Sequence, residues 1–145
     1  MELSDLYREV ILTHATHPHN YGELEHPDKK SHGANPICGD AFDIEIKLEG
    51  ERISEIKFHG MGCSISKASA SMMTEMAKGK TLNEFEELLE KIEKLVRGEL
   101  SPEERASLGD LAALAGVASF PARVKCAILP WKTLESAIES DESDE

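Results

Sequence analysis

The sequence predicts an α+β fold, with helices packed on one face of a small antiparallel sheet. The order of the expected elements supports this prediction, because one helix comes first, strands follow and several helices complete the chain. Over residues 42–48, apolar Phe, Ile, Ile and Leu alternate with charged residues, which is the pattern of a half-buried strand. The length of 145 residues suits a single domain, which we expect to span residues 1–139.

The first expected element is a helix from about Ser4 to His14, for which Ser4 is a suitable N-cap. Pro18 and the turn residues 20–22 end this helix. The segment that follows, up to Pro36, is rich in glycine, proline and histidine. Its strand signal is weak, and we therefore predict a loop there.

The strand at residues 42–48 is the first of a pair. Glu49 and Gly50 predict a tight turn after it, and the second strand is expected from about Arg52 to Phe58. The Gly-Met-Gly sequence of residues 60–62 indicates a turn. A helix from Ser64 to Lys78 follows this turn.

Helices make up the C-terminal half. Thr81 and Glu84 form a capping-box pattern at the start of an amphipathic helix that ends at Gly98. Pro102, after Ser101, starts a short helix, because proline is favoured at the first helical position. Residues 108–119 are rich in alanine and leucine, and their pattern fits more than one structure.

The last expected helix runs from about Pro121 to Ile138 and contains Pro130. This proline leaves two alternatives. Either the helix is continuous and kinked beside Cys126, whose carbonyl loses its usual N–H partner, or the helix proper begins near Pro130. Residues 140–145 are acidic, and we expect them to be a disordered tail.

Charge and hydropathy exclude several function classes. The chain has 28 acidic against 16 basic residues and a net charge of −12, with no dense run of Lys or Arg. We therefore expect no nucleic acid and no anionic membrane surface as a partner, whereas a partner with a basic patch would be attracted. The longest apolar run of the first thirty residues is residues 10–12, far too short for a signal peptide. The expected location is cytoplasmic.

The three cysteines form an odd set in a chain without a secretion signal, which favours metal binding or thiol chemistry over a disulfide framework. Cys38 and Asp40 share the parity of the apolar stripe at residues 42–48. If the extended backbone begins at Cys38, its thiolate and the Asp40 carboxylate can meet one metal ion. The alternative is that each cysteine is a small buried apolar residue.

Cys63 and Cys126 also lie at the ends of predicted elements. Cys63 directly precedes the helix that begins at Ser64, and a helix N-terminus favours a thiolate. Cys126 lies early in the last helix, where Arg123 and Lys125 supply positive charge.

The histidines carry a weaker signal. His14, His17 and His19 cluster near the end of the first helix, and we expect solvated surface side chains there. His59, close to Cys63 in sequence, is an alternative metal ligand.

Three ordered motifs resemble the SufU branch of the IscU-like proteins, the family that includes the N-terminal part of NifU. The resemblance spans about residues 4–138. The motifs are Asn35-Pro36-Ile37-Cys38-Gly39-Asp40, Gly60-Met61-Gly62-Cys63-Ser64-Ile65-Ser66 with Ala68-Ser69-Ala70-Ser71, and Ala122-Arg123-Val124-Lys125-Cys126 with Trp131.

This resemblance implies a compact IscU-like α+β domain with about three antiparallel strands, and so one strand more than the pattern locates. It implies a metal site formed by Cys38, Asp40, Cys63 and Cys126, with Arg123 and Lys125 offsetting part of its negative charge. The implied process is iron–sulfur cluster assembly. The implied partners are a cysteine desulfurase, which is a pyridoxal phosphate enzyme, and downstream iron–sulfur scaffold or apo-acceptor proteins.

Two departures separate the chain from the IscU scaffold branch. Lys125 precedes the third cysteine where the scaffolds have histidine, and residues 120–125 lack the Leu-Pro-Pro-Val-Lys motif that an Hsp70 chaperone reads. An Hsp70 partner is therefore not expected. Residues 97–119 resemble the additional segment of the SufU branch. These features favour a zinc-bound sulfur acceptor, or sulfurtransferase, with Cys38 as the acceptor.

Two alternatives stay open. In the first, the same residues carry a [2Fe–2S] or [4Fe–4S] cluster, and the chain is a scaffold or carrier that passes the cluster to apo-proteins. In the second, zinc is purely structural, and no desulfurase responds to the chain.

Overall fold

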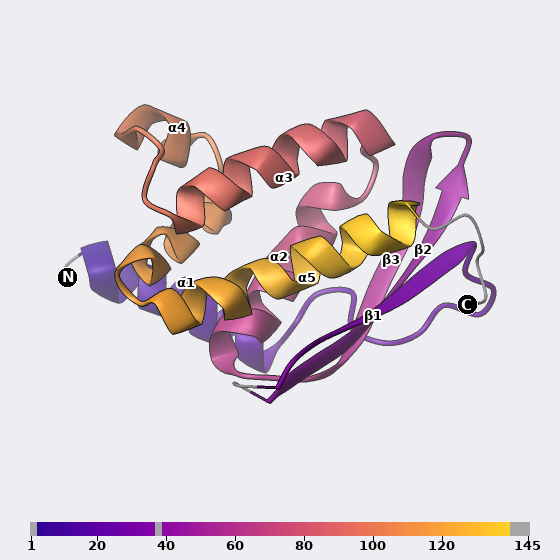
Figure 1. Cartoon of the computed structure of the whole chain (residues 1–145), viewed down its shortest axis with the longest axis horizontal. Coiled ribbons are helices and arrows are strands. Elements are labelled where there is room, and N and C mark those ends of the chain that lie inside the picture. The colour runs from indigo at the N-terminus through magenta and orange to yellow at the C-terminus, as the bar shows by residue number, and fades with distance from the viewer. Residues whose placement is uncertain (1–2, 37–38, 140–145) are drawn as a thin grey trace.

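The structure, a computed structural model, describes residues 3–36 and 39–139, with side chains in the first helix from residue 8 onward. Strands and helices are segregated along the chain, as the sequence predicts (Figure 1). The elements in order are α1 (Leu3–Thr16), β1 (Lys29–Asn35), β2 (Asp40–Glu49), β3 (Arg52–Met61), α2 (Ser64–Ala77), α3 (Leu82–Val96), α4 (Pro102–Ala106), the 3₁₀ helix η1 (Gly109–Ser119) and α5 (Pro121–Glu139).

The sheet has three strands in the order β1-β2-β3, and both pairs are antiparallel. Asn35 pairs with Asp40 at the loop end of the first hairpin, and Ala41 pairs with Met61 on the other side of β2. The loop prediction for residues 23–36 is wrong over β1, because this segment is a strand. Its sequence, Lys-Lys-Ser-His-Gly-Ala-Asn, has no apolar stripe, so its pairing with β2 comes from the tertiary structure.

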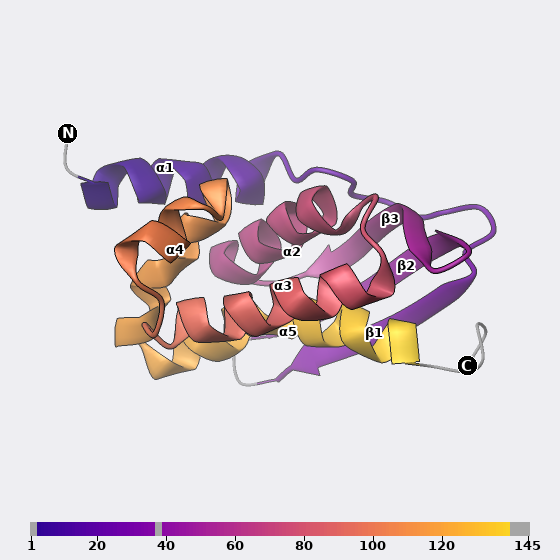
Figure 2. The same cartoon turned by 90° about the horizontal axis from the view of Figure 1, so that it is seen from above.

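The helices cover one face of the sheet, and α2 lies at the centre between α1 and α5 (Figures 1 and 2). The inner face of the sheet presents fully buried side chains to them, among them Phe42, Ile44, Ile46, Ile53 and Phe58. Helix α5 lies so close to β1 that a side chain in place of Gly33 would collide with Thr133. The core therefore lies between the sheet and the α2–α5 pair.

Helix α5 continues through Pro130, so the continuous alternative is correct and the helix does not begin at the proline. The ring of Trp131, fully buried, stacks on Phe85 of α3 with centroids 6.0 Å apart and planes 7° from parallel. Its Nε1–H donates a hydrogen bond to Ser69 Oγ on α2 at 2.9 Å. The hydroxyl of Ser69 in turn donates to the carbonyl of Ala127, which ties α2 to α5.

Most element boundaries agree with the sequence, and the exceptions have local causes. Helix α1 begins at Leu3, so Ser4 lies in its first turn and is not its N-cap. Strand β3 extends to Met61, beyond the predicted end at Phe58, because Gly60 and Met61 still pair with β2. Residues 109–119 form a 3₁₀ helix of unusual length, which covers α1 and α3 with buried leucines.

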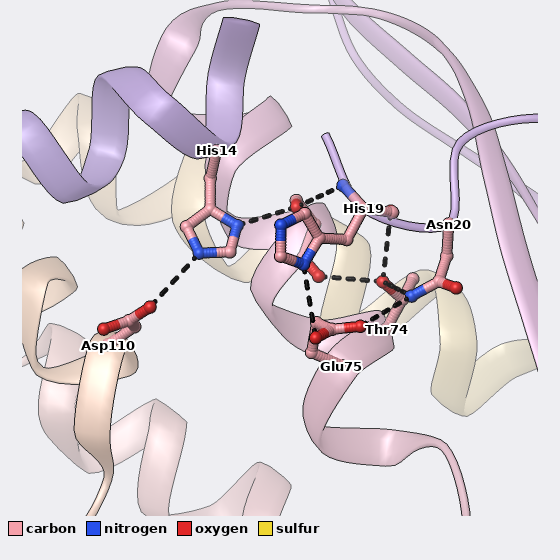
Figure 3. A network of polar contacts seen from close by, with 7 residues as sticks. His14, His19, Asn20, Thr74, Glu75 and Asp110 are labelled. Carbon is pink, nitrogen blue, oxygen red and sulfur yellow. Dashed lines mark hydrogen bonds and ion pairs between the residues drawn. The ribbon is translucent and has the colours of Figure 1, made fainter. Parts of the chain in front are cut away.

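A polar network anchors the end of α1 (Figure 3). His14 is only 7% exposed, contrary to the prediction of a solvated side chain. Its Nδ1 lies 2.7 Å from Ser71 Oγ on α2, and its Nε2 lies 3.4 Å from Asp110 Oδ2 on η1. The main-chain N–H of His19 donates to the same Ser71 oxygen at 2.7 Å.

Among residues 3–36 and 39–139, every helix is too short or too polar to span a lipid bilayer.

Candidate metal and thiol centre

Asp40 is the first residue of β2, and its side chain points to the core face of the sheet, with 1% exposed. Its Oδ1 accepts two hydrogen bonds, both at 2.9 Å, from the Cys63 main-chain N–H and from the Ser66 hydroxyl. Its Oδ2 is buried and has no hydrogen-bond partner within the described part of the chain. An anionic oxygen in such a position is costly unless a cation binds it.

Cys63 is the N-cap residue of α2, with extended backbone angles of φ −73° and ψ 171°. Its Sγ accepts a hydrogen bond from the Ser66 main-chain N–H at 3.5 Å. The sulfur therefore takes the place that a Ser or Asp side chain usually takes at a helix N-terminus. The sulfur thus lies at the N-terminus of α2, where the positive end of the helix dipole is directed.

Cys126 is fully buried in the first half of α5, and its sulfur lies close to the side chains of Asp40 and Cys63. One carboxylate oxygen of Asp40 and the sulfur atoms of Cys63 and Cys126 lie within 4.8 Å of one another. These atoms come from β2, the start of α2 and α5, so the whole fold contributes to the cluster.

Arg123 lies almost one turn before Cys126 on α5, and its guanidinium contacts both sulfur atoms. The negative charge of Cys63, and then that of Cys126, raises the pKa of Arg123 above its ordinary value, and hydrogen bonds to both sulfurs act in the same direction. A fixed positive charge at this position stabilises two neighbouring thiolates.

The structure thus brings Asp40, Cys63, Cys126 and Arg123 together. Cys38, the predicted acceptor and fourth ligand, lies outside the described residues. Lys125 is exposed on α5. His59 is not near this cluster, because its side chain is on the opposite face of the sheet, where it pairs with Asp43 and Glu45.

Two residues outside the predicted ligand set, Ser66 and Gly62, also shape the site. Ser66, fully buried, holds Asp40 through its hydroxyl, and its position three residues after the N-cap is the signal that could have identified it. Gly62 provides space, because a Cβ there would lie 2.8 Å from both Asp40 Oδ1 and Phe42 Cζ and would collide with Ser66 Oγ. Close packing, and not a turn conformation, requires this glycine.

A largely apolar groove of about 870 Å³ opens beside Cys63 and Arg123. Its apolar walls come from α1, the start of α2, η1 and the residue before α5, namely Ile11, Leu12, Ile65, Val117 and Phe120. The half-buried Cys63 lies at this groove, whereas Cys126 is fully buried. The groove gives a second molecule access to the cysteine cluster.

The donor set fits a bound metal ion. Two thiols and a carboxylate converge, and Asp40 Oδ2 is a lone-pair donor without a partner among residues 3–36 and 39–139. Zinc prefers four ligands of this kind in a tetrahedral arrangement, at sulfur distances of about 2.3 Å. Gly39, the neighbour of Asp40, has φ 76°, a turn conformation that favours glycine.

The chain matches a known protein family over most of its length. A profile described as the NifU-like N terminal domain matches residues 6–127, which include Asp40, Cys63 and Cys126. The chain belongs to this family. The matched range also includes η1.

Relatives of two kinds match nearly the whole chain. The zinc-dependent sulfurtransferase SufU of Bacillus subtilis is 41% identical over 97% of this chain and 94% of that protein. The iron–sulfur cluster assembly scaffold protein IscU of Thermotoga maritima is 39% identical over 92% of each chain. Among solved structures, FiSufU of Fervidobacterium islandicum is similar to this fold with a TM-score of 0.84 and 35% identity, over 95% of this chain and 100% of that one. These likenesses confirm the IscU-like α+β fold that the sequence predicts.

Proposed function

We propose that this chain is a zinc-dependent sulfur acceptor in iron–sulfur cluster assembly, which receives sulfur from the persulfide of a cysteine desulfurase. The convergence of the Asp40 carboxylate with the thiols of Cys63 and Cys126 carries the proposal. The name of the B. subtilis relative, a zinc-dependent sulfurtransferase, supports the same assignment. Downstream acceptors would be an iron–sulfur scaffold or apo-proteins.

Zinc is proposed to bind Cys38, Asp40, Cys63 and Cys126. Bound zinc would keep the thiols deprotonated and protect them from oxidation. Four anionic ligands around a divalent cation leave a net charge of about −2. Arg123 offsets part of this charge, since its guanidinium contacts the sulfur atoms of Cys63 and Cys126.

Cys38 is the proposed acceptor. Its thiolate would attack the outer sulfur of the desulfurase persulfide, and the sulfur–sulfur bond of the donor would break. The desulfurase cysteine would leave as a thiolate, and Cys38 would carry the persulfide, with no net oxidation or reduction. Gly39, next to Cys38 in sequence, has a positive φ that favours glycine, whereas Cys126 is fully buried and Cys63 caps α2.

The test combines metal analysis with a desulfurase assay. The chain is purified without added metal, and zinc, iron and acid-labile sulfide are measured. Desulfurase turnover of cysteine is then followed with the wild type, with Cys38→Ser and with Ser107→Ala, an exposed serine that serves as the matched control. We expect about one zinc ion per chain, because four ligands of this kind form one closed tetrahedral site. We also expect strong stimulation by the wild type and the control, and none by Cys38→Ser.

Mass spectrometry after the reaction identifies the acceptor directly. We expect one additional sulfur atom on the peptide that contains Cys38. Stimulation by Cys38→Ser at the wild-type level, or the sulfur on Cys63 or Cys126, contradicts the acceptor assignment.

A cluster scaffold or carrier is the second candidate, because the T. maritima relative is named a scaffold at nearly the same identity. Cysteine thiolates also suit [2Fe–2S] and [4Fe–4S] clusters. This function predicts iron with acid-labile sulfide after anaerobic reconstitution, transfer of the cluster to an apo-protein, and little stimulation of the desulfurase. Zinc without any desulfurase response would instead indicate a structural metal site.

A further inference from the structure

A second group of potential metal ligands lies on the face of the sheet opposite Asp40. Side chains alternate along β2, so Asp40, Phe42 and Ile44 face the helices whereas Asp43 and Glu45 face outward. His59 of β3 is the cross-strand partner of Asp43 and shares this outer face. The group is therefore separated from the cysteine cluster by the sheet itself.

The segment between α1 and β1 covers part of this face. It runs along β3, where the Gly22 N–H donates to the Phe58 carbonyl at 2.8 Å. The Leu24 N–H donates to Glu45 Oε1 at 2.7 Å. These bonds hold Glu23 over the sheet, and Glu45 is only 8% exposed.

Three of these side chains converge. Glu23, Glu45 and His59 each offer one ligand atom, and these atoms lie within 4.8 Å of one another. His59 Nε2 lies 3.5 Å from Glu45 Oε2. One imidazole nitrogen and two carboxylate oxygens form a donor set that first-row divalent transition metals accept.

The second ring nitrogen of His59, Nδ1, lies near the carboxylate of Asp43. His59 Nδ1 lies 3.8 Å from Asp43 Oδ2, and Asp43 Oδ1 is bonded to His32 Nδ1 at 3.0 Å. Metal-binding histidines commonly direct the second ring nitrogen to a carboxylate, which fixes the tautomer and the orientation of the ring. Asp43 is placed to do this for His59.

The charges of the group also call for a cation. Glu45 is a nearly buried carboxylate with a second carboxylate, Glu23, beside it. Its cross-strand neighbours are Lys30 and Lys57, yet among the described residues its ion pair is with His59. Two adjacent ionised carboxylates, one of them nearly buried, repel each other, and a cation bound between them offsets this repulsion.

We propose that Glu23, Glu45 and His59 form a second divalent metal site, with Asp43 as the residue that positions His59. The site takes a first-row transition ion that accepts oxygen and imidazole ligands, such as Mn²⁺ or Fe²⁺. Three protein ligands leave further coordination positions for water. Since Glu23 belongs to the connecting segment and the other ligands to β2 and β3, a bound ion ties this segment to the sheet. This proposal is independent of the proposed function at the cysteines.

The test uses Mn²⁺ as the probe and the full chain, purified with its thiolate site loaded with zinc. Mn²⁺ prefers oxygen ligands to thiolates, so it does not compete for the cysteine cluster. Its binding is followed by the loss of the free Mn²⁺ electron paramagnetic resonance signal. We expect one saturable site, whose affinity falls at least tenfold in Glu23→Gln and in His59→Asn.

Two further variants separate this site from general acidity and test the role of Asp43. Glu135→Gln changes another carboxylate group, Glu86, Glu135 and Glu139, and is expected to leave Mn²⁺ binding unchanged. Asp43→Asn is expected to weaken it by roughly 10–100-fold, the usual effect of removing a carboxylate that orients a metal-bound histidine.

Circular dichroism and melting in the presence of a chelator check that each variant is folded as the wild type. The proposal is overturned if Mn²⁺ shows no saturable site, or if Glu23→Gln and His59→Asn bind like the wild type. An equal loss in Glu135→Gln also overturns it, because binding would then reflect overall negative charge.

Discussion

The carboxylate of Asp40 accepts a hydrogen bond from the main-chain amide of Cys63, at 2.9 Å and across 23 residues of sequence. The bond joins the start of β2 to the N-terminus of α2, and Ser66 adds a second bond to the same oxygen, Oδ1. Since Oδ2 has no such partner among the described residues, the two oxygens of Asp40 have different roles. One holds the fold together, and the other is available to a ligand.

Asp40→Asn separates these roles. The amide oxygen can still accept the Cys63 N–H bond, but the NH₂ group replaces the free anionic oxygen and cannot bind a cation. We expect the chain to remain folded and its zinc affinity, measured by competition with a chromogenic chelator, to fall at least tenfold. Asp43→Asn, on the opposite face of the same strand, is the control and should bind zinc at the cysteines normally. Equal zinc affinity in Asp40→Asn and the wild type would contradict the ligand assignment.

Ser66→Ala tests the orientation of Asp40. Removing the buried hydroxyl leaves Asp40 Oδ1 with the Cys63 N–H alone, so the carboxylate is held less firmly. Residues that orient a metal ligand typically contribute about 10–100-fold to affinity, and we expect a loss in this range in the same chelator competition. Ser64→Ala changes an exposed serine two residues earlier and should have no effect. A wild-type affinity for Ser66→Ala would show that the hydroxyl does not position Asp40.

Gly62→Ala tests the space beside the site. The added methyl group would lie 2.8 Å from Asp40 Oδ1 and Phe42 Cζ, which is too close for carbon to approach either atom. Overpacking of this kind typically costs about 1–3 kcal/mol, so we expect a lower free energy of unfolding in urea together with weaker zinc binding. Gly116→Ala is the matched control, because a Cβ at Gly116 meets nothing within 4 Å. Equal effects of the two substitutions would mean that packing at Gly62 is not the cause.

Trp131→Phe tests the contact between α2 and α5. The variant keeps an aromatic ring near Phe85 but removes the Nε1–H that bonds to Ser69 Oγ. Leaving a buried polar atom without its partner costs about 1–3 kcal/mol, and we expect a loss of this size in urea unfolding. A double-mutant cycle with Ser69→Ala provides the control. The two losses should be less than additive, and strictly additive losses would show that the bond contributes nothing.

Glu86→Gln tests an unfavourable charge between α3 and α5. Burial, and then the negative charge of Glu135, raise the pKa of Glu86 above its ordinary value. A raised pKa in the folded chain means that Glu86 contributes stability below the ordinary glutamate pKa, and that this contribution is lost as pH rises through the folded-state value. Glu86→Gln should therefore stabilise the chain at pH 7 by up to about 1 kcal/mol, and the gain should vanish in acid.

Urea unfolding of Glu86→Gln at several pH values gives this dependence. Glu87→Gln, an exposed neighbour on α3, should show little change at any pH. A gain for Glu86→Gln that is the same in acid and at neutral pH would exclude the ionised carboxylate as its source.

Elements whose signals are local could be predicted from the sequence. The capping box of Thr81 and Glu84 and the apolar stripe of α3 specify that helix within one segment, and the structure shows both hydrogen bonds of the box. Strand β1 could not be located, because its polar residues become a strand only by pairing with β2. His14 was expected at the surface for a similar reason, since Ser71 and Asp110, its partners, are 57 and 96 residues away in sequence.

The candidate site likewise contains residues that the sequence motifs identify and residues whose role depends on the tertiary structure. Cys63, Cys126 and Asp40 were identified by their motifs and by their positions at the ends of elements, and the structure brings them together. The position of Ser66 three residues after the N-cap is a partial sequence signal, whereas the close packing at Gly62 depends on how β2 approaches α2. The role of Cys38 as acceptor, the disordered tail at 140–145 and the cytoplasmic location stay predictions.

At the N-cap of α2, the main-chain N–H of Ser66 donates to Cys63 Sγ, so this amide responds to a chemical change at the sulfur. Cys63 Sγ accepts the Ser66 N–H at 3.5 Å, and such a bond is strongest when the sulfur is anionic. A proton or an alkyl group on the sulfur would weaken the bond, and exchange of the Ser66 amide hydrogen with solvent would accelerate. Hydrogen exchange at this one amide is therefore a spectroscopic probe of Cys63 that requires neither a metal nor a partner protein.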